Sequence, residues 1–293
     1  SPKKSSNASA RILHGKPHAE ALLAEIAPIA AELSPNLTIV QVGDDPASST
    51  YIRKKIEAAE SIGITAKHLK LPDSISLVSL LDQLDSLNHD PDVTGYIVQL
   101  PLPDHLWDAF DRIAAEIHPD KDVDGFTAEN FGDMALNGMG EFLPPATAAG
   151  VVRLLECEKI AIAGAHVVVV GRSNLVGKPL ALMLLNRNAT VTVCHSKTRD
   201  LANITKTADI LVSAVGKPNL ITADMVKDGA VVIDIGTTHV DGKLAGDVDF
   251  DAVSKKASAI TPVPGGVGPL TVACLLSNVV DAAEEAASSD DHA

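Results

Sequence analysis

The chain has 293 residues, of which 46% are hydrophobic, and its 24 basic residues stand against 38 acidic ones, a formal net charge of −14. A chain this long and this apolar folds into one large or two ordinary domains, which excludes an intrinsically disordered protein. The negative charge repels phosphate backbones and anionic lipids, and only 3% of the residues are aromatic. We therefore expect no nucleic-acid partner and no membrane partner.

The cysteines and the chain ends indicate a soluble, cytoplasmic protein. Cys157, Cys194 and Cys274 lie far apart without a Cys-x-x-Cys pair, so we expect them to be reduced and mostly buried. The sequence has no run of 18 apolar residues, and its polar N-terminus does not lead into the apolar segment of a secretion signal. Residues 1–8 and 287–293 are small and polar, and we expect them to be flexible tails.

In the first half of the chain, helical and strand patterns alternate. Helical spacing of apolar residues and short β-branched runs predict, in chain order, a helix over 18–33, a strand over 37–42, a helix over 48–62, a strand over 66–71, a helix over 75–87 and a strand over 95–100. Strands that alternate with helices are typical of a parallel α/β layer.

After Pro144 and Pro145 the pattern restarts. It predicts a helix over 148–155, a strand over 165–170, a helix from about 178, further strands over 190–194, 210–214, 231–235 and 259–261, and a last helix over 270–286. These runs predict a Rossmann-like, doubly wound parallel sheet. We therefore expect two α/β domains: a substrate domain over 9–144 and 270–286, with the last helix packing back on it, and a nucleotide-binding domain over 145–269.

The first strand of the second half leads into a glycine-containing turn, Gly171 to Pro179. It is not a clean Gly-x-Gly-x-x-Gly, because Ser173 takes the middle position, although a serine is small enough for a phosphate to approach the backbone. Free amides at the start of the following helix favour an anion. An ordinary strand-to-helix turn has the same local pattern. The residues after the next strand must therefore show whether this turn binds a nucleotide.

The residues after the 190–194 strand favour NADP over NAD. NAD sites place an Asp or Glu at that strand end to hold the ribose hydroxyls. Here the chain continues with His195, Ser196 and Lys197, and Arg172 lies in the preceding turn; cationic and hydroxyl groups suit a 2′-phosphate. Solvated turn residues are the alternative. Two later strand ends, at Gly216 and at Gly236 and Thr237, are expected to line the same cofactor cleft.

In the first half, a lysine is the candidate for proton transfer. Tyr51 and Lys55 are four residues apart, so they share a helix face beside the apolar stripe of Ile52 and Ala59. Partial desolvation lowers a lysine pKa toward neutrality, as proton transfer requires. A surface lysine on a basic helix is the commoner explanation of such a residue. The uncharged amide of Gln99, at a strand end, could orient Lys55 without fixing it as a cation.

Two other motifs are weaker on their own. Residues 120–125 (DKDVDG) resemble the start of a calcium loop, but position twelve is Phe131 instead of a bidentate Glu, so we expect no metal site. Asp124, held by a glycine turn, could instead accept hydrogen bonds from the N–H groups of a heterocycle. Residues 261–271 (TPVPGGVGPLT) combine stiffening prolines with glycines that let a flat ligand touch the backbone.

Taken together, Tyr51-x-x-x-Lys55, VQLPLP at 98–103, KDVDGF at 121–126, GRSNLVGKP at 171–179 and TPVPGGVGPLT at 261–271 resemble the bifunctional methylenetetrahydrofolate dehydrogenase/cyclohydrolase family over about residues 9–286. One departure is Ala148, where the family usually has a second proline, and we expect the hinge there to be less rigid. Tyr-x-x-x-Lys also occurs in short-chain dehydrogenases, but there it follows the nucleotide loop.

The resemblance implies that 5,10-methylenetetrahydrofolate is oxidised with NADP to the methenyl compound and then hydrolysed to 10-formyltetrahydrofolate, as part of one-carbon metabolism, in a homodimer. It implies that Tyr51 stacks on the folate, that Asp124 anchors the pterin ring, and that Lys55, assisted by Gln99, moves protons during hydrolysis. The implied contacts with folate also include Val98, Leu100, Pro264, Gly265, Gly266 and Val267. The implied contacts with the cofactor are Gly171, Arg172, Ser173, Val176, Ser196, Gly216 and Thr237.

Two other functions remain as alternatives. A shikimate-type or amino-acid-type dehydrogenase also combines a substrate domain with a nucleotide domain, but it would not explain PGGVG at 264–268 or the pairing of Lys55 with Gln99. A non-catalytic NADP-binding sensor would not need Lys55, Gln99 and Asp124.

Overall fold

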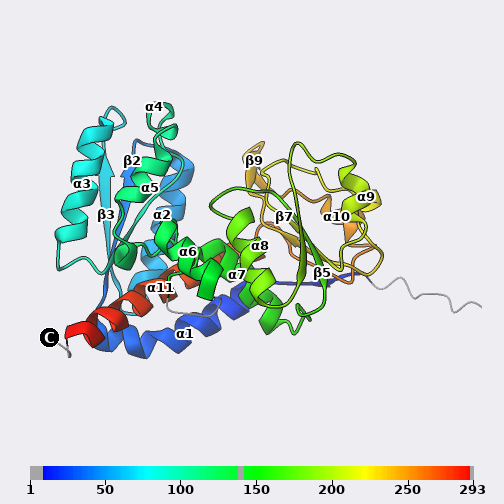
Figure 1. Cartoon of the computed structure of the whole chain (residues 1–293), viewed down its shortest axis with the longest axis horizontal. Helices are drawn as coiled ribbons and strands as arrows, with labels where there is room; N and C mark the ends of the chain where they lie inside the picture. The colour runs from blue at the N-terminus through cyan, green and yellow to red at the C-terminus, as the bar shows by residue number, and fades with distance from the viewer. Residues whose placement is uncertain (1–8, 138–141, 291–293) are drawn as a thin grey trace, which may run out of the picture. The chain divides into compact units, whose positions relative to one another are not determined.

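The computed structural model describes residues 9–137 and 142–290, which form two compact α/β units (Figure 1). The three-strand unit comprises the described parts of Glu20–Ala146 and Val272–Ala293, and the six-strand unit those of Ser1–Ala19 and Thr147–Thr271. Each unit has its own parallel sheet, as the alternation of strands and helices predicts.

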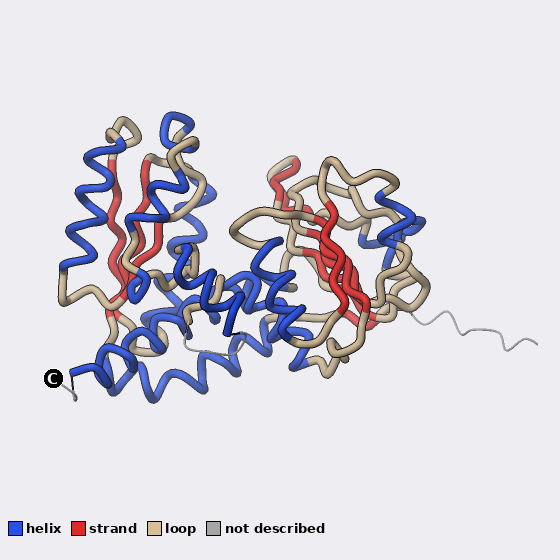
Figure 2. The backbone as a smooth tube through the Cα atoms, viewed as in Figure 1, coloured by secondary structure: helices blue, strands red, loops and turns tan. Residues whose placement is uncertain are grey.

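The sheet of the three-strand unit has the order β3-β2-β4, and both pairings are parallel. Figure 2 shows the strands of both units in red and the helices in blue. Its elements in chain order are α1 (Lys16–Leu33), β2 (Asn36–Val42), α2 (Pro46–Glu60), β3 (Thr65–Leu71), α3 (Leu77–His89), β4 (Gly95–Val98), α4 (Asp104–Trp107), α5 (Phe110–Glu116), the 3-10 turn η1 (Pro119–Lys121) and α6 (Ala128–Asn137). The predicted elements of this half are confirmed within a few residues at their ends.

Local chemistry fixes the start of α2, the helix that carries Lys55. Asp45 is the N-cap residue, and its carboxylate accepts a hydrogen bond from Ser48 N at 2.7 Å. Pro46 occupies the first helical position, where a missing N–H costs nothing. Ile52 and Ala59 are buried and hold this face of the helix against the core, so the orientation of α2 is set by both cap and packing.

The six-strand unit contains the doubly wound sheet, with the order β1-β11-β8-β7-β5-β6 and only parallel pairings. Its elements in chain order are β1 (Arg11–Ile12), α7 (Ala146–Cys157), β5 (His166–Val170), α8 (Gly177–Asn186), β6 (Thr190–Cys194), α9 (Leu201–Thr205), β7 (Ile210–Ser213), η2 (Ala223–Met225), β8 (Val231–Asp234), β9 (Thr238–Val240), β10 (Lys243–Ala245), α10 (Phe250–Val253) and β11 (Ala259–Ile260). The strands β9 and β10 form a separate antiparallel hairpin.

The beginning of the chain differs from the expected domain boundary. The sequence pattern assigned residues 9–144 to the first domain, whereas the residues up to Ala19 group with the six-strand unit. The reason is β1, in which Arg11 and Ile12 pair with Ala259 and Ile260 at the edge of the larger sheet. A strand of two residues has too little periodicity to be recognised in a sequence.

The last helix, α11 (Val267–Asp290), belongs from Val272 onward to the three-strand unit, as predicted. Asn278 on this helix donates hydrogen bonds to the carbonyls of Val123 and Pro144, both at 2.8 Å. The helix continues through residues 287–290, which were expected to belong to a flexible tail. The other residues of the expected tails, 1–8 and 291–293, lie outside the described part of the chain.

Helix α11 is also long and apolar enough over Val267–Ser288 to cross a membrane, but more than half of that stretch is buried inside the protein, as in the core helix of a soluble protein. Cys194 and Cys274 are buried and Cys157 is exposed, and none of the three forms a disulfide. Ala148 lies in the first turn of α7 and is fully buried.

Candidate active site

The candidate proton-transfer site lies where β2 and β4 end. With the order β3-β2-β4, the connections from β2 and β4 diverge, and ligands in open α/β sheets bind at such a switch point. Lys55 is carried by α2, the helix after β2, and Gln99 follows β4 directly. Gln99 N donates to the carbonyl of Val40 at 2.8 Å, which extends the sheet register to the glutamine.

Lys55 and Gln99 are in direct contact. Lys55 Nζ donates a hydrogen bond to Gln99 Oε1 at 3.0 Å, and Gln99 Nε2 donates to the carbonyl of Leu100 at 2.8 Å, so the amide presents its oxygen to the amine. The Lys55 side chain is half-buried, whereas Arg53 and Lys54 are exposed. Burial lowers the pKa of Lys55, and the nearby negative charge of Asp124 opposes this. The amine is thus oriented by a neutral partner.

Asp124 completes this group. Burial raises the pKa of its carboxyl to about 6; Lys55 lowers it and the neighbouring charge of Asp122 raises it further. Gly125 follows with φ +73°, and a Cβ at this position would lie 2.5 Å from Pro145 N. A side chain therefore cannot replace the glycine without moving the loop, and the tight turn keeps the Asp124 carboxyl in place.

The neighbouring Asp122 has a structural role that the sequence did not reveal. It is fully buried, and its carboxylate accepts hydrogen bonds from Phe126 N at 3.0 Å, Thr127 N at 2.7 Å and Asn130 Nδ2 at 3.1 Å. These donors occupy the oxygens that a calcium loop would direct at a cation. The apolar Val123 directly after Asp122 was the only local signal of burial, and it is a weak one because Lys121 precedes Asp122.

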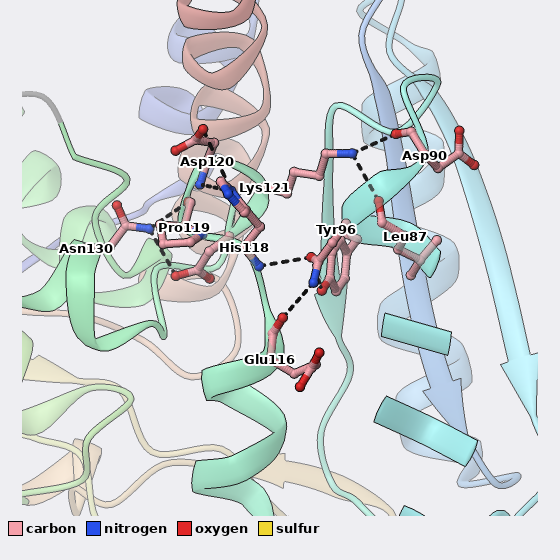
Figure 3. A network of polar contacts seen from close by, with 11 residues as sticks. Leu87, Asp90, Tyr96, Glu116, His118, Pro119, Asp120, Lys121 and Asn130 are labelled. Carbon is pink, nitrogen blue, oxygen red and sulfur yellow. Dashed lines mark hydrogen bonds and ion pairs between the residues drawn. The ribbon is translucent and has the colours of Figure 1, made fainter. Parts of the chain in front are cut away.

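A second group of polar contacts anchors the same loop from its other side (Figure 3). Lys121 Nζ donates to the carbonyls of Leu87 at 3.0 Å and Asp90 at 2.6 Å, at the end of α3. Tyr96 OH donates to Asn88 Oδ1 at 2.8 Å, and His118 N donates to the same oxygen at 2.9 Å. The loop that presents Asp124 is therefore fixed by α3 and β4.

The other predicted folate contacts of this unit are placed as follows. Tyr51 is 37% exposed, one helical turn before Lys55 on α2, so its ring is accessible for stacking. Val98 is buried in the core around α3, so a ligand would meet its main chain only. Leu100 is half-buried and precedes a cis Pro101.

The candidate nucleotide site belongs to the six-strand unit. The strand order reverses at β5, with β6 on one side and β7 on the other, which makes the ends of β5 and β7 the switch point of this sheet. Gly171 follows β5 with φ +130°, and a Cβ there would lie 2.4 Å from the carbonyl oxygen of Ala214. The backbone after β5 is thus held against the end of β7 without a side chain in the way.

We expected free main-chain amides at the start of α8, but the side chain of Ser173 binds two of them. Its hydroxyl accepts hydrogen bonds from Val176 N at 3.1 Å and Gly177 N at 3.3 Å. A serine side chain therefore caps this helix. Lys178, which is exposed, donates to Asn174 Oδ1 at 2.6 Å, so the turn itself is held by local polar contacts.

The remaining cofactor candidates lie at neighbouring strand ends. Arg172, Ser196 and Thr237 are exposed, and residues 194–199 after β6 include no Asp or Glu. Gly216 follows β7 with φ +65°, and its carbonyl accepts a hydrogen bond from Thr238 Oγ1 at 3.1 Å. The loops after β7 and β8 are therefore linked.

Residues 264–267 also lie in the six-strand unit. Gly265 has φ +103°, and its carbonyl accepts a hydrogen bond from Gly15 N at 3.0 Å. A Cβ on Gly266 would come within 2.6 Å of the Pro262 carbonyl oxygen. Val267 is buried as the first residue of α11. The two glycines give this segment its close packing.

Comparisons with known proteins agree over both units. A model of the tetrahydrofolate dehydrogenase/cyclohydrolase catalytic domain matches residues 13–124, and one of the NAD(P)-binding domain of the same family matches residues 145–287. The bifunctional protein FolD of Burkholderia pseudomallei is 50% identical over 287 residues, 96% of this chain and 99% of the relative.

Solved structures give the same result. The bifunctional FolD enzyme of Campylobacter jejuni is 44% identical, with a TM-score of 0.91, over 95% of this chain and 100% of that chain. FolD of Trypanosoma brucei, solved with NADP and an inhibitor, is 37% identical, with a TM-score of 0.90, over 96% of this chain and 99% of that chain. The chain therefore belongs to the tetrahydrofolate dehydrogenase/cyclohydrolase family.

Proposed function

We propose that the protein oxidises 5,10-methylenetetrahydrofolate to 5,10-methenyltetrahydrofolate with NADP and hydrolyses the product to 10-formyltetrahydrofolate. Family membership over both units supports the two activities. The observation that carries the proposal is the hydrogen bond of 3.0 Å from Lys55 Nζ to the neutral Gln99 amide. It favours this chemistry over a shikimate-type dehydrogenase and over a non-catalytic NADP sensor, neither of which has a use for such a pair.

In the hydrolytic step, Lys55 acts as the proton carrier. Water attacks the methenyl carbon, and the adduct must lose a proton before a carbon–nitrogen bond of the ring breaks and that nitrogen is protonated. An amine whose pKa is lowered by burial can accept the first proton and return it for the second transfer. The cationic substrate lowers the pKa of Lys55 further, because like charges disfavour the ammonium form.

Asp124 and Tyr51 hold the folate in this proposal. The Asp124 carboxyl is half-buried and accepts hydrogen bonds from pterin N–H groups, which stabilise its ionised form against the burial that raises its pKa to about 6. Tyr51 stacks on the ring from the same helix face as Lys55. Val98, Gln99 and Leu100 line the strand end, and the resemblance to the family implies that residues 264–267 also contact the folate.

The residues of the six-strand unit fit NADP. Gly171 lets the turn after β5 pack closely against the end of β7 at the switch point. Exposed Arg172 and Ser196 could hold the 2′-phosphate, since residues 194–199 offer no carboxylate for an unphosphorylated ribose. Ser173 and Val176 lie in the same turn, and Gly216 and Thr237 at the next two strand ends. When bound, NADP supplies the hydride acceptor of the first step, and the residues of the chain orient folate for it.

We further propose that the enzyme is cytoplasmic and homodimeric, and that it has no nucleic-acid or membrane partner. The net charge of −14 and the three cysteines outside any disulfide support the cellular location, because a reducing compartment keeps thiols from oxidising to disulfides. The resemblance to the family supports the dimer.

The test follows methenyltetrahydrofolate by absorbance after methylenetetrahydrofolate is mixed with NADP⁺ or NAD⁺. We expect the signal to rise and decay, with tighter binding of NADP⁺. Lys55→Met should reduce the decay to its rate without enzyme, whereas Lys54→Met, a matched change of an exposed lysine on the same helix, should leave it intact. Absence of the rise in the unmodified protein would refute the dehydrogenase, and unchanged decay in Lys55→Met would remove Lys55 from the hydrolysis.

A further inference from the structure

Two buried carboxylates lie behind the loops that we assign to the cofactor, and no step of the proposed reaction uses them. Asp234 ends β8 and is 4% exposed, and Asp247 lies between β10 and α10 and is fully buried. Neither residue was predicted as a site residue. The sequence features that could have pointed to them are the position of Asp234 at the end of a buried strand and the position of Asp247 in Gly-Asp-Val-Asp.

Asp247 holds the chain that leaves β7. Its Oδ2 accepts hydrogen bonds from Ser213 Oγ at 2.9 Å and Val215 N at 2.8 Å, and its Oδ1 accepts one from Lys217 N at 2.8 Å. The two amides flank Gly216, the residue with φ +65° at the switch point. One carboxylate thus fixes both sides of a turn that would otherwise have no regular hydrogen-bond ladder.

Asp234 holds Asp247 in turn. Its Oδ1 accepts from Asp247 N at 3.0 Å and from Gly236 N at 2.9 Å, and its Oδ2 accepts from Val248 N at 2.9 Å. The contact is so close that a Cβ at Gly236 would lie 2.2 Å from Asp247 Oδ1, and one at Gly246 would lie 2.0 Å from Asp234 Oδ2. The glycines therefore make room for the carboxylates.

Burying Asp234 and Asp247 next to each other destabilises the folded state. Burial raises the pKa of Asp234 to about 6, and the charge of Asp247 adds to the increase, while the backbone amides oppose it. Two like charges in one buried cluster destabilise the fold unless their hydrogen bonds compensate. Three of the six bonds come from the main chain of two cofactor loops, from Val215 and Lys217 after β7 and from Gly236 after β8. The other three come from Ser213 at the end of β7 and from the amides of Asp247 and Val248.

We infer that Asp247, supported by Asp234, is a positioning residue for NADP, which fixes the turn 215–217 against the turn at 236 in the conformation that binds the cofactor. This inference rests on the proposed function. It also explains the bond from Thr238 Oγ1 to the Gly216 carbonyl, which links the same two turns on their other side.

The test measures the dissociation constant of NADP⁺ and both activities of the full chain carrying Asp247→Asn. An asparagine keeps one acceptor oxygen but replaces the other with an NH₂ group, which cannot accept a hydrogen bond. At least one of the bonds from Ser213 Oγ, Val215 N and Lys217 N is therefore lost. We expect the dissociation constant and the KM of NADP⁺ to rise about tenfold. The dehydrogenase kcat at saturating NADP⁺ and the hydrolysis of added methenyltetrahydrofolate should stay within about twofold.

Asp249→Asn is the matched control. Asp249 Oδ1 caps α10 by accepting from Ala252 N at 3.2 Å, and asparagine caps a helix equally well, so NADP⁺ binding should not change. Ser213→Ala removes one donor to Asp247 and keeps both carboxylates; we expect a rise of about threefold in the dissociation constant, and this variant decides the question if Asp247→Asn does not fold. Unchanged NADP⁺ binding in the folded variants would overturn the inference. Absence of NADP⁺ binding in the unmodified protein would instead refute the proposed function.

Discussion

The neutral partner of Lys55 can be tested by giving it a charge. Gln99→Glu keeps the length of the side chain but places a carboxylate 3.0 Å from Lys55 Nζ. At that distance two unit charges attract by roughly 5 kcal/mol in an effective dielectric constant of about 20. Solvent at the half-buried pair and the desolvation of the new carboxylate reduce this to about 2 to 3 kcal/mol, which raises the pKa of Lys55 by about 2 units.

The assay is the hydrolysis of methenyltetrahydrofolate between pH 6 and 9, corrected for the rate without enzyme. If the neutral amine of Lys55 accepts the proton, Gln99→Glu should move the acidic limb of the pH profile upward by about 2 units and reduce the rate at pH 7 by roughly ten- to a hundredfold. Gln99→Met, of similar length and uncharged, should lower the rate without this displacement. A Gln99→Glu profile that overlays the unmodified one would refute the argument.

Two further variants test the loop that presents Asp124. Burial raises the pKa of the Asp124 carboxyl from 3.8 to about 6. The folded state is therefore destabilised as the pH rises from 3.8 through 6 and this carboxyl ionises. Asp124→Asn removes that charge, so it should add up to about 2 to 3 kcal/mol to the free energy of unfolding at pH 8 and little at pH 4. Equal effects at both pH values in denaturant titrations would contradict this. Asn278→Ala leaves the carbonyls of Val123 and Pro144 without their donor. It should lower the free energy of unfolding by about 2 to 4 kcal/mol and reduce the rate of hydrolysis. The control is Ser288→Ala, on the exposed face of the same helix, which should lower the free energy of unfolding by less than about 0.5 kcal/mol. A similar loss in both α11 variants would speak against the role of Asn278.

Hydrophobic patterning was sufficient for most of the long elements, but it did not predict the ten-residue helix α6. The strand over residues 190–194 was predicted with the bounds that β6 has, and the buried run that became β5 differs by one residue. Among the short strands, the two-residue β11 was predicted, whereas β1 with two residues and the hairpin strands β9 and β10 with three each were not. Such segments are held by their partners in the sheet, and their own sequences carry too few residues for a period to appear.

Some of the functional residues could likewise be predicted from the sequence and others could not. Lys55 was recognisable because four-residue spacing places it beside a buried stripe, and Gln99 because it ends a strand. The structural carboxylates Asp122, Asp234 and Asp247 were not, since their neighbours in sequence do not show which backbone amides will surround them. A carboxylate that accepts two or three hydrogen bonds from the main chain looks, in a sequence, the same as one that faces a ligand.

The sequence by itself determined the longer strands and most of the longer helices, the two-domain α/β class, and the residue types at each strand end, because these follow from local periodicity. Only the tertiary structure decided that Lys55 meets Gln99, 44 positions away in the chain, and that Asp124 has a raised pKa while its neighbour Asp122 is held by amides. The physical reason is that desolvation and hydrogen bonding depend on every chain segment packed around a group, and strand order brings those segments together.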